Sequence, residues 1–128
     1  MYYICIMDLE RNNAQMRKGV LELCILSIVS HEDAYASDII EKLKEAKLIV
    51  VEGTLYPLLT RLKNEGMLSY RWEESTQGPP RKYYRITETG QQLLDRMAED
   101  FRELVEAVEV LLGSTPTPVS PPPIGGGD

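Results

Sequence analysis

The 128-residue sequence predicts a mainly α-helical fold with one small β-hairpin, an α+β domain. Three observations predict it. Apolar residues recur at three- and four-residue spacing in segments before residue 66. They alternate with polar residues in two short runs, at 68–72 and 83–86, and helical spacing returns over residues 87–112. The order of helix, helix, helix, hairpin and long helix is that of a winged helix-turn-helix domain followed by a long C-terminal helix.

The composition favours a non-enzymatic protein without a metal or cofactor. The chain has a net charge of −6, two scattered cysteines, Cys5 and Cys24, and one histidine, His31. These residues have no zinc-site spacing, and no nucleophile-and-base set or phosphate-binding glycine loop is present. No apolar run approaches the roughly 20 residues that span a bilayer, and the N-terminal "MYYICIM" lacks the basic start of a signal peptide. We therefore expect a cytoplasmic protein without a membrane partner.

The first helix is predicted over Met16–Ser30, after an N-terminal extension at residues 1–15. It carries two apolar stripes at helical spacing. The first comprises Leu21, Cys24, Ile25 and Ile28, and the second Leu23 and Leu26. A helix that is apolar on two sides is buried on two sides, so the second stripe suggests a partner subunit.

The second and third helices are joined by a short link. Ser37 is the predicted N-cap of the second helix, which extends to about Lys47. The third helix is predicted over Glu52–Glu65. Pro57 is expected in or near its first turn, where a proline is tolerated, and Gly66 ends the helix.

A hairpin with a long polar tip follows the third helix. Leu68, Tyr70 and Trp72 form one face of its first strand. In the returning strand we expect Tyr84 to face the core, because it shares a face with Ile86. The neighbouring Tyr83 is then exposed.

The last helix is predicted to begin at the N-cap Thr87 and to end near residue 112. Its apolar seam, at alternating spacings of three and four, comprises Leu94, Met97, Phe101, Leu104, Val108 and Leu111. A helix of this length extends beyond a small three-helix core, so the seam predicts a dimer interface. The alternative is that the seam is one face of an intramolecular core helix. The Pro/Gly-rich residues 113–128 predict a disordered tail.

Positive charge is concentrated in one segment. Residues 54–85 contain six Lys/Arg and three Asp/Glu, a local charge of +3. Residues 86–112 contain two Lys/Arg and seven Asp/Glu, a local charge of −5. Since charges are screened beyond about 8–10 Å, this local sign matters more than the net charge for contact with a polyanion. The three hairpin cations Arg81, Lys82 and Arg85 are therefore predicted to contact DNA phosphates. The alternative is a solvated hairpin with incidental cations.

Two long segments carry a family resemblance. "GTLYPLLTRLKNEGML" followed by "GPPRKYYRITETG" resembles the PadR family of bacterial transcriptional regulators, and so do "RKGVLELCILSIV" and "YASDIIEKLK" upstream. The resemblance covers Met16–Leu112, and its most specific parts are Thr54–Leu62 and Arg81–Gly90. The single C-terminal helix resembles the smaller subgroup of the family.

The resemblance implies a homodimeric DNA-binding regulator, usually a repressor that a small molecule releases. It implies a recognition helix at Glu52–Glu65. The DNA-contacting residues that it implies are Thr54, Tyr56, Arg61, Arg81 and Lys82. Phe101 looks like the family aromatic that lines a flat effector pocket at the dimer centre, although the family residue is Trp. Alternatively, Phe101 is a seam residue that fills the interface.

The predicted domains are thus an extension at 1–15, a winged helix-turn-helix DNA-binding domain at 16–86, a dimerisation helix at 87–112 and a tail at 113–128. The predicted partners are double-stranded DNA, a second copy of the chain and a small aromatic effector. A winged-helix module that assembles proteins without binding DNA is the main alternative, and the net acidity supports it. A metal- or redox-sensing regulator is a weaker alternative, because the ligand spacing is missing.

Overall fold

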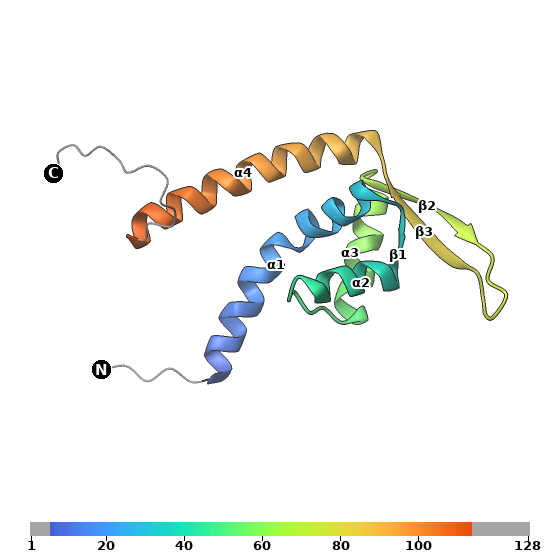
Figure 1. Ribbon diagram of the computed structural model, residues 1–128, viewed down its shortest axis with the longest axis horizontal. Coiled ribbons are helices and arrows are strands. Elements are labelled where there is room, and N and C mark those ends of the chain that lie inside the picture. The colour runs from blue at the N-terminus through green and yellow to red at the C-terminus, as the bar shows by residue number, and fades with distance from the viewer. Residues whose placement is uncertain (1–5, 114–128) are drawn as a thin grey trace. The chain divides into compact units, whose positions relative to one another are not determined.

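The computed structural model describes residues 6–113 and shows the predicted order of helices and hairpin (Figure 1). The elements are α1 (Ile6–His31), β1 (Ala34–Tyr35), α2 (Ala36–Glu45), α3 (Glu52–Asn64), β2 (Leu68–Glu73), β3 (Arg81–Ile86) and α4 (Glu88–Leu112). The chain divides into two compact units, one that ends at Asp95 and one that begins at Arg96. The first unit is a winged helix-turn-helix, as the sequence predicts. The predicted tail lies outside the described residues, apart from Gly113.

Helix α1 begins ten residues earlier than predicted, at Ile6 instead of Met16. The sequence from Ile6 to Gln15 contains neither proline nor glycine, so nothing in it stops a helix, although it lacks a clear apolar stripe. Most of the predicted 1–15 extension is therefore helical. The division of the chain into functional domains stays a prediction.

The buried face of α1 is narrower than the two predicted stripes. Among the α1 side chains that the structure describes, Leu21, Ile25, Leu26 and Val29 are buried. Leu23, Cys24 and Ile28 are partly exposed. Burial nevertheless raises the pKa of the Cys24 thiol, which lowers its thiolate fraction at neutral pH. The thiol therefore behaves as a small apolar group of the helix.

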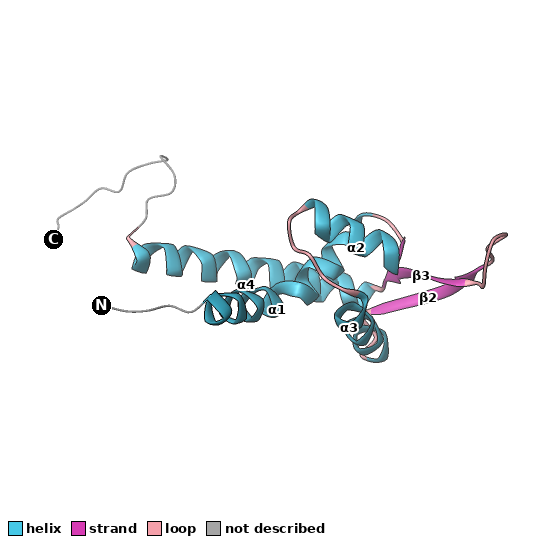
Figure 2. Cartoon of the chain, turned by 90° about the horizontal axis from the view of Figure 1, so that it is seen from below, coloured by secondary structure: helices cyan, strands magenta, loops and turns pink. Residues whose placement is uncertain are grey.

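The hairpin belongs to a three-stranded antiparallel sheet in the order β1-β3-β2 (Figure 2). The sequence did not predict β1, since a two-residue strand has no measurable period. Ala34 lies opposite Tyr84, and Tyr35 lies opposite Tyr83. Strand β1 therefore fixes the hairpin to the start of α2.

Helix α2 begins one residue before the predicted N-cap, so the prediction for Ser37 is wrong. The N-cap is Tyr35, whose backbone N–H donates a hydrogen bond of 3.0 Å to the Asp38 carboxylate. An acidic residue at the third helical position caps the helix in this way. The Ser37 hydroxyl is left free to accept a 3.2 Å hydrogen bond from the Arg81 guanidinium.

Helix α3 matches its prediction to within one residue at its C-terminus. It buries Leu55, Leu59 and Leu62. The helix ends at Asn64, and Gly66 follows the C-cap Glu65 with a φ of 82°, a backbone conformation that favours glycine. The Met67 N–H donates to the Leu62 carbonyl at 2.9 Å.

Pro57 is the sixth residue of α3, in its second turn, rather than in the predicted first turn. Proline has no N–H to donate to the carbonyl four residues earlier, which belongs to Gly53. Both residues are exposed, so water can bond that carbonyl.

The sheet confirms the predicted orientation of the two adjacent tyrosines. Tyr84 is only 3% exposed and faces the core, whereas Tyr83 is partly exposed and packs against the Tyr35 ring at 4.7 Å. Leu68 is buried on the same face as Tyr84. Trp72, also predicted on this face, is 60% exposed, because the hairpin projects beyond the helices that cover its base (Figure 1).

Thr87 is confirmed as the N-cap of α4 and joins three segments. Its hydroxyl oxygen accepts a 2.9 Å hydrogen bond from the Gly90 N–H. The same hydroxyl donates to the Gly66 carbonyl at 2.6 Å, and the Thr87 N–H donates to the Met67 carbonyl at 3.0 Å. The start of α4 is thereby held against the end of α3.

We expect Gly90→Ala to destabilise the protein. Gly90 is buried, and a Cβ at this position would collide with the Met67 carbonyl oxygen and with Ile86. Because the neighbouring atom belongs to the backbone, the contact cannot relax by rotating a side chain. Overpacking of this kind costs about 1–3 kcal/mol, which urea unfolding measures.

Gly53→Ala is the matched control for this prediction. Gly53 also lies in a helix, but a Cβ there meets no atom within 4 Å. Replacing a helical glycine by alanine at an open position stabilises by about 0.5–1 kcal/mol. Equal urea midpoints for Gly90→Ala and the wild type would contradict the close packing of α4 on Met67.

Candidate nucleic-acid interface

A groove of about 440 Å³ lies where the start of α2, the exposed side of α3 and the hairpin meet. Its lining residues are Tyr35, Ala36, Ser37, Tyr56, Trp72, Pro80, Arg81, Lys82 and Tyr84. Three of the predicted DNA-contacting residues therefore line one surface: Tyr56, Arg81 and Lys82. The lining combines four aromatic side chains with two cations, which suits a polyanion with apolar sugar faces.

Helix α3 contributes Tyr56 to this groove, whereas Thr54, also predicted to contact DNA, is not among its lining residues. Thr54 is exposed at the third helical position, and Tyr56 is 46% exposed. Burial raises the pKa of the Tyr84 hydroxyl, and the neighbouring Tyr56 and Tyr70 hydroxyls raise it further. The Tyr84 hydroxyl is therefore neutral at neutral pH, and Tyr84 lines the same groove as Tyr56.

The two cations at the start of β3 are held by aromatic rings. The Arg81 guanidinium lies 3.8 Å from the centre of the Tyr35 ring, while its NH2 group donates to Ser37. The Lys82 ammonium lies 4.7 Å from the Tyr70 ring centre and 5.6 Å from that of Trp72. Among residues 16–113, no acidic side chain forms an ion pair with either cation. Both charges are therefore oriented without being neutralised.

The other two hairpin arginines are already paired. Arg71 donates to the Glu73 carboxylate at 2.7 Å and lies 3.6 Å from the Asp33 carboxylate. The Asp33 carboxylate also lies 3.8 Å from the Arg85 guanidinium. Arg85 was predicted to contact DNA, but the structure does not place it in the groove, and its role stays a prediction.

Arg61 is likewise separate from the groove. Its guanidinium pairs with the Glu22 carboxylate of α1, and the Glu65 carboxylate lies 4.0 Å away on the same helix. This pairing joins α3 to α1, which gives Arg61 a structural partner. A DNA contact by Arg61 stays a prediction.

Sequence reasoning did not assign the other six groove residues to a binding surface: Tyr35, Ala36, Ser37, Trp72, Pro80 and Tyr84. Tyr35 and Ser37 depend on the unpredicted strand β1 and on the contact with Arg81, which is 44 residues from Ser37. Trp72 did have a usable signal. It is the apolar residue of β2 nearest the hairpin tip, and Leu68 at the other end of the strand already packs in the core.

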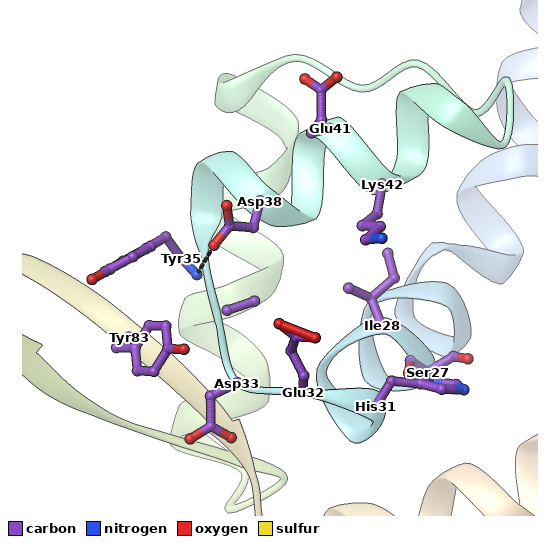
Figure 3. Close-up of a pocket in the computed structure, with 11 residues that line it drawn as sticks. Ser27, Ile28, His31, Glu32, Asp33, Tyr35, Asp38, Glu41, Lys42 and Tyr83 are labelled. Carbon is purple, nitrogen blue, oxygen red and sulfur yellow. Dashed lines mark hydrogen bonds between the residues drawn. The ribbon is translucent and has the colours of Figure 1, made fainter.

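A second cavity, of about 510 Å³, lies between the end of α1, β1, α2 and Tyr83 (Figure 3). Four of its lining side chains are carboxylates, from Glu32, Asp33, Asp38 and Glu41, whereas Lys42 is its one lysine or arginine. This surface would repel a polyanion. Tyr35 lines both cavities, so the acidic surface and the groove adjoin at this residue. No group of His, Cys, Asp and Glu in the described residues could hold a metal ion.

The apolar seam of α4 is covered only at its start. Leu94 is buried in the first unit, and Met97 is partly exposed. Beyond Arg96, Phe101 is 38% exposed and Leu104 is 61% exposed. Val108 and Leu111 are exposed as well. A row of uncovered apolar side chains is the arrangement expected of an interface seen in one protomer. None of the described helices is long and apolar enough to cross a membrane.

Comparisons with known proteins agree with this fold. Residues 25–96 match the Transcriptional regulator PadR-like family. A PadR-like transcription factor from Bacteroides fragilis is 60% identical, and the match covers 79% of this chain and 98% of that one with a TM-score of 0.68. A PadR family regulator from Eggerthella lenta is 30% identical, with coverages of 84% and 94% and a TM-score of 0.76. The Bacillus cereus PadR-like regulator is 38% identical, with coverages of 79% and 99% and a TM-score of 0.69.

Two curated proteins also match the chain. An uncharacterised protein from Lysinibacillus sphaericus is 26% identical over 98 residues, which cover 74% of this chain and 90% of that protein. The transcriptional regulator YqjI of Escherichia coli is 33% identical over 94 residues, 71% of this chain. The match spans only 42% of the length of YqjI.

Proposed function

Because the chain belongs to the PadR-like family of transcriptional regulators, we propose that it is a homodimeric repressor that binds a specific DNA operator. Its relatives are transcription factors and not enzymes. The observation that carries the proposal is the groove beside α3, in which Arg81 and Lys82 are oriented by aromatic rings and have no acidic partner among the described residues. In this proposal, DNA phosphates are the anionic partners of these two cations.

Helix α3 is the recognition helix in this proposal. The major groove of DNA is about 12 Å wide and admits one α-helix. The exposed N-terminal half of α3, with Thr54 and Tyr56, then faces the base edges. The hairpin beside it carries Arg81 and Lys82 toward the neighbouring phosphates. Phosphate contacts position such a domain, and contacts with base edges give the sequence specificity.

The seam of α4 is the proposed dimer contact. Two copies that bury Phe101, Leu104, Val108 and Leu111 against each other remove an exposed apolar row from water. A dimer also presents two recognition helices to two half-sites. A planar aromatic effector at Phe101 would act at this interface and would change the spacing of the two helices.

The direct test of this function is binding to duplex DNA over a range of salt concentrations. We expect binding at low salt and a steep linear fall of log K with log salt, since each phosphate contact releases counterions. The wild-type protein and a random-sequence duplex suffice for the first measurement. If the chain instead assembles proteins, as its net charge of −6 would allow, no duplex binding will occur even at low salt.

We expect Tyr56→Ala to reduce specific binding more than non-specific binding. Tyr56 lies at the exposed N-terminal half of α3, where base edges are within reach. Losing one good base contact costs about 1–3 kcal/mol at a specific site. The measurement compares affinities for a selected duplex and for random DNA. Tyr56→Phe is the matched control that keeps the ring and removes the hydroxyl. An equal loss on both DNAs would assign Tyr56 to packing or to phosphate contact.

A further inference from the structure

Trp72 is exposed at a position where the fold does not require an indole. It is the single tryptophan of the chain and is 60% exposed on the outer half of β2. The core on this face of the sheet is completed by Leu68 and Tyr84, which are 2% and 3% exposed. A polar residue at position 72 would leave the stability of the fold about the same, since a single exposed apolar residue adds little to it.

The indole is nevertheless held in a defined position. Its ring meets the Tyr70 ring edge-on, with centroids 5.8 Å apart and planes at 85°. Trp72 lies directly opposite Lys82 in the β2–β3 register, and the Lys82 ammonium lies 5.6 Å from its ring. The ring therefore stands beside a cation that has no acidic partner in the described part of the chain.

The residues around the Trp72 ring indicate which ligand group would pack against it. Trp72 lines the same groove as Tyr56 of α3 and Arg81 of β3, so it continues the surface that we propose binds DNA. The surface is basic there, whereas the cavity on the other side of Tyr35 is acidic. The sugar-phosphate backbone offers an apolar deoxyribose face next to each phosphate, which matches an indole next to an ammonium group.

We propose that Trp72 is a DNA-contacting residue of the hairpin, whose indole packs on a deoxyribose of the duplex while Lys82 binds the adjacent phosphate. This inference rests on the proposed DNA binding and adds a non-ionic contact to it. Because the sugar is the same in every nucleotide, the contact contributes affinity without sequence specificity. It also holds the hairpin at a fixed depth along the backbone.

The intrinsic fluorescence of Trp72 tests the contact in the wild-type protein, because no other tryptophan contributes. We expect saturating duplex DNA to change the emission and to shield the indole from acrylamide. Inorganic polyphosphate is the control for charge alone, and it should bind the cations without shielding the ring. Unchanged acrylamide quenching with saturating duplex, or equal shielding by polyphosphate, would overturn the proposal.

The second arm compares affinities of variants. Trp72→Ala should weaken binding about tenfold, equally on a selected and on a random duplex, since it loses apolar burial of about half a large side chain. The slope of log K against log salt should not change, because no ionic contact is lost. Trp72→Phe, which keeps a ring, should retain most of the affinity. Circular dichroism of each variant checks the fold.

The outcomes separate this inference from the proposed function. If the wild-type protein binds no duplex, the proposed function fails and the inference fails with it. If the wild type binds with the expected salt dependence but folded Trp72→Ala binds within twofold of it, the inference alone is overturned. A loss confined to the selected duplex would assign the ring to a base and would also overturn the backbone contact.

Discussion

Replacing Phe101 by alanine should convert the dimer into monomers at concentrations where the wild type is dimeric. Phe101 lies in the middle of the α4 seam, with Met97 on one side and Leu104 and Val108 on the other. Truncating a large aromatic at the centre of an interface costs about 2–4 kcal/mol. A symmetric dimer loses this contact twice, so the dissociation constant should rise about a thousandfold or more.

Sedimentation velocity measures this change, and Val110→Ala is the matched control. Val110 is another apolar residue of the same helix and is 72% exposed, but it lies off the seam. It should leave the dimer intact. Loss of the dimer should also weaken operator binding, because one protomer holds only one recognition helix. If Phe101→Ala remains a tight dimer, Phe101 does not pack in the dimer interface.

Phe101 also allows a test of the effector hypothesis. If the dimer survives in Phe101→Ala, the position lines a pocket or faces solvent instead. Planar aromatic compounds should then release DNA from the wild type and fail to release it from the variant. Equal release from both proteins would remove Phe101 from effector binding.

The double variant Arg81→Ala/Lys82→Ala should lose most of its affinity for any duplex. Each phosphate contact contributes about 0.9 to the slope of log K against log salt. If both cations contact phosphates in both protomers of a dimer, the slope should fall by about 4. The loss should be similar for selected and random sequences, because phosphates carry no sequence information.

Arg71→Ala is the control for this prediction. Its guanidinium belongs to the same hairpin but is paired with Glu73 and Asp33. The Glu73 hydrogen bond also raises the pKa of Arg71, so this pairing favours the charged guanidinium. We expect little change in the slope for this variant. An unchanged slope in the double variant would exclude the hairpin from phosphate contact.

The sequence predicted the elements that have a clear period or clear end signals. Helix α3 has an apolar stripe and a terminal glycine at Gly66, and the hairpin has a period of two around a polar tip. Thr87 was identifiable as an N-cap because of its residue type. These are local properties, so they can be identified from the sequence without knowledge of the tertiary fold.

The features that the sequence did not predict depend on distant contacts. Strand β1 forms because Ala34 and Tyr35 meet β3 almost 50 residues later. The pairing of Arg61 with Glu22, and of Arg85 with Asp33, also joins residues far apart in the chain. Residue type alone cannot show which cations pair with a carboxylate. Among the described residues, Arg85 has such a partner, whereas Arg81 and Lys82 do not.

Selection of bound sequences from random duplex DNA tests directly whether α3 and the hairpin bind a specific operator. We expect enrichment of a two-fold symmetric motif whose half-sites lie about one helical turn, roughly 10 base pairs, apart, since a dimer presents two copies of α3. The enriched duplex should bind much more tightly than random DNA at physiological salt. If no motif is enriched and the protein retains no duplex at low salt, α3 and the hairpin do not form a DNA-binding surface.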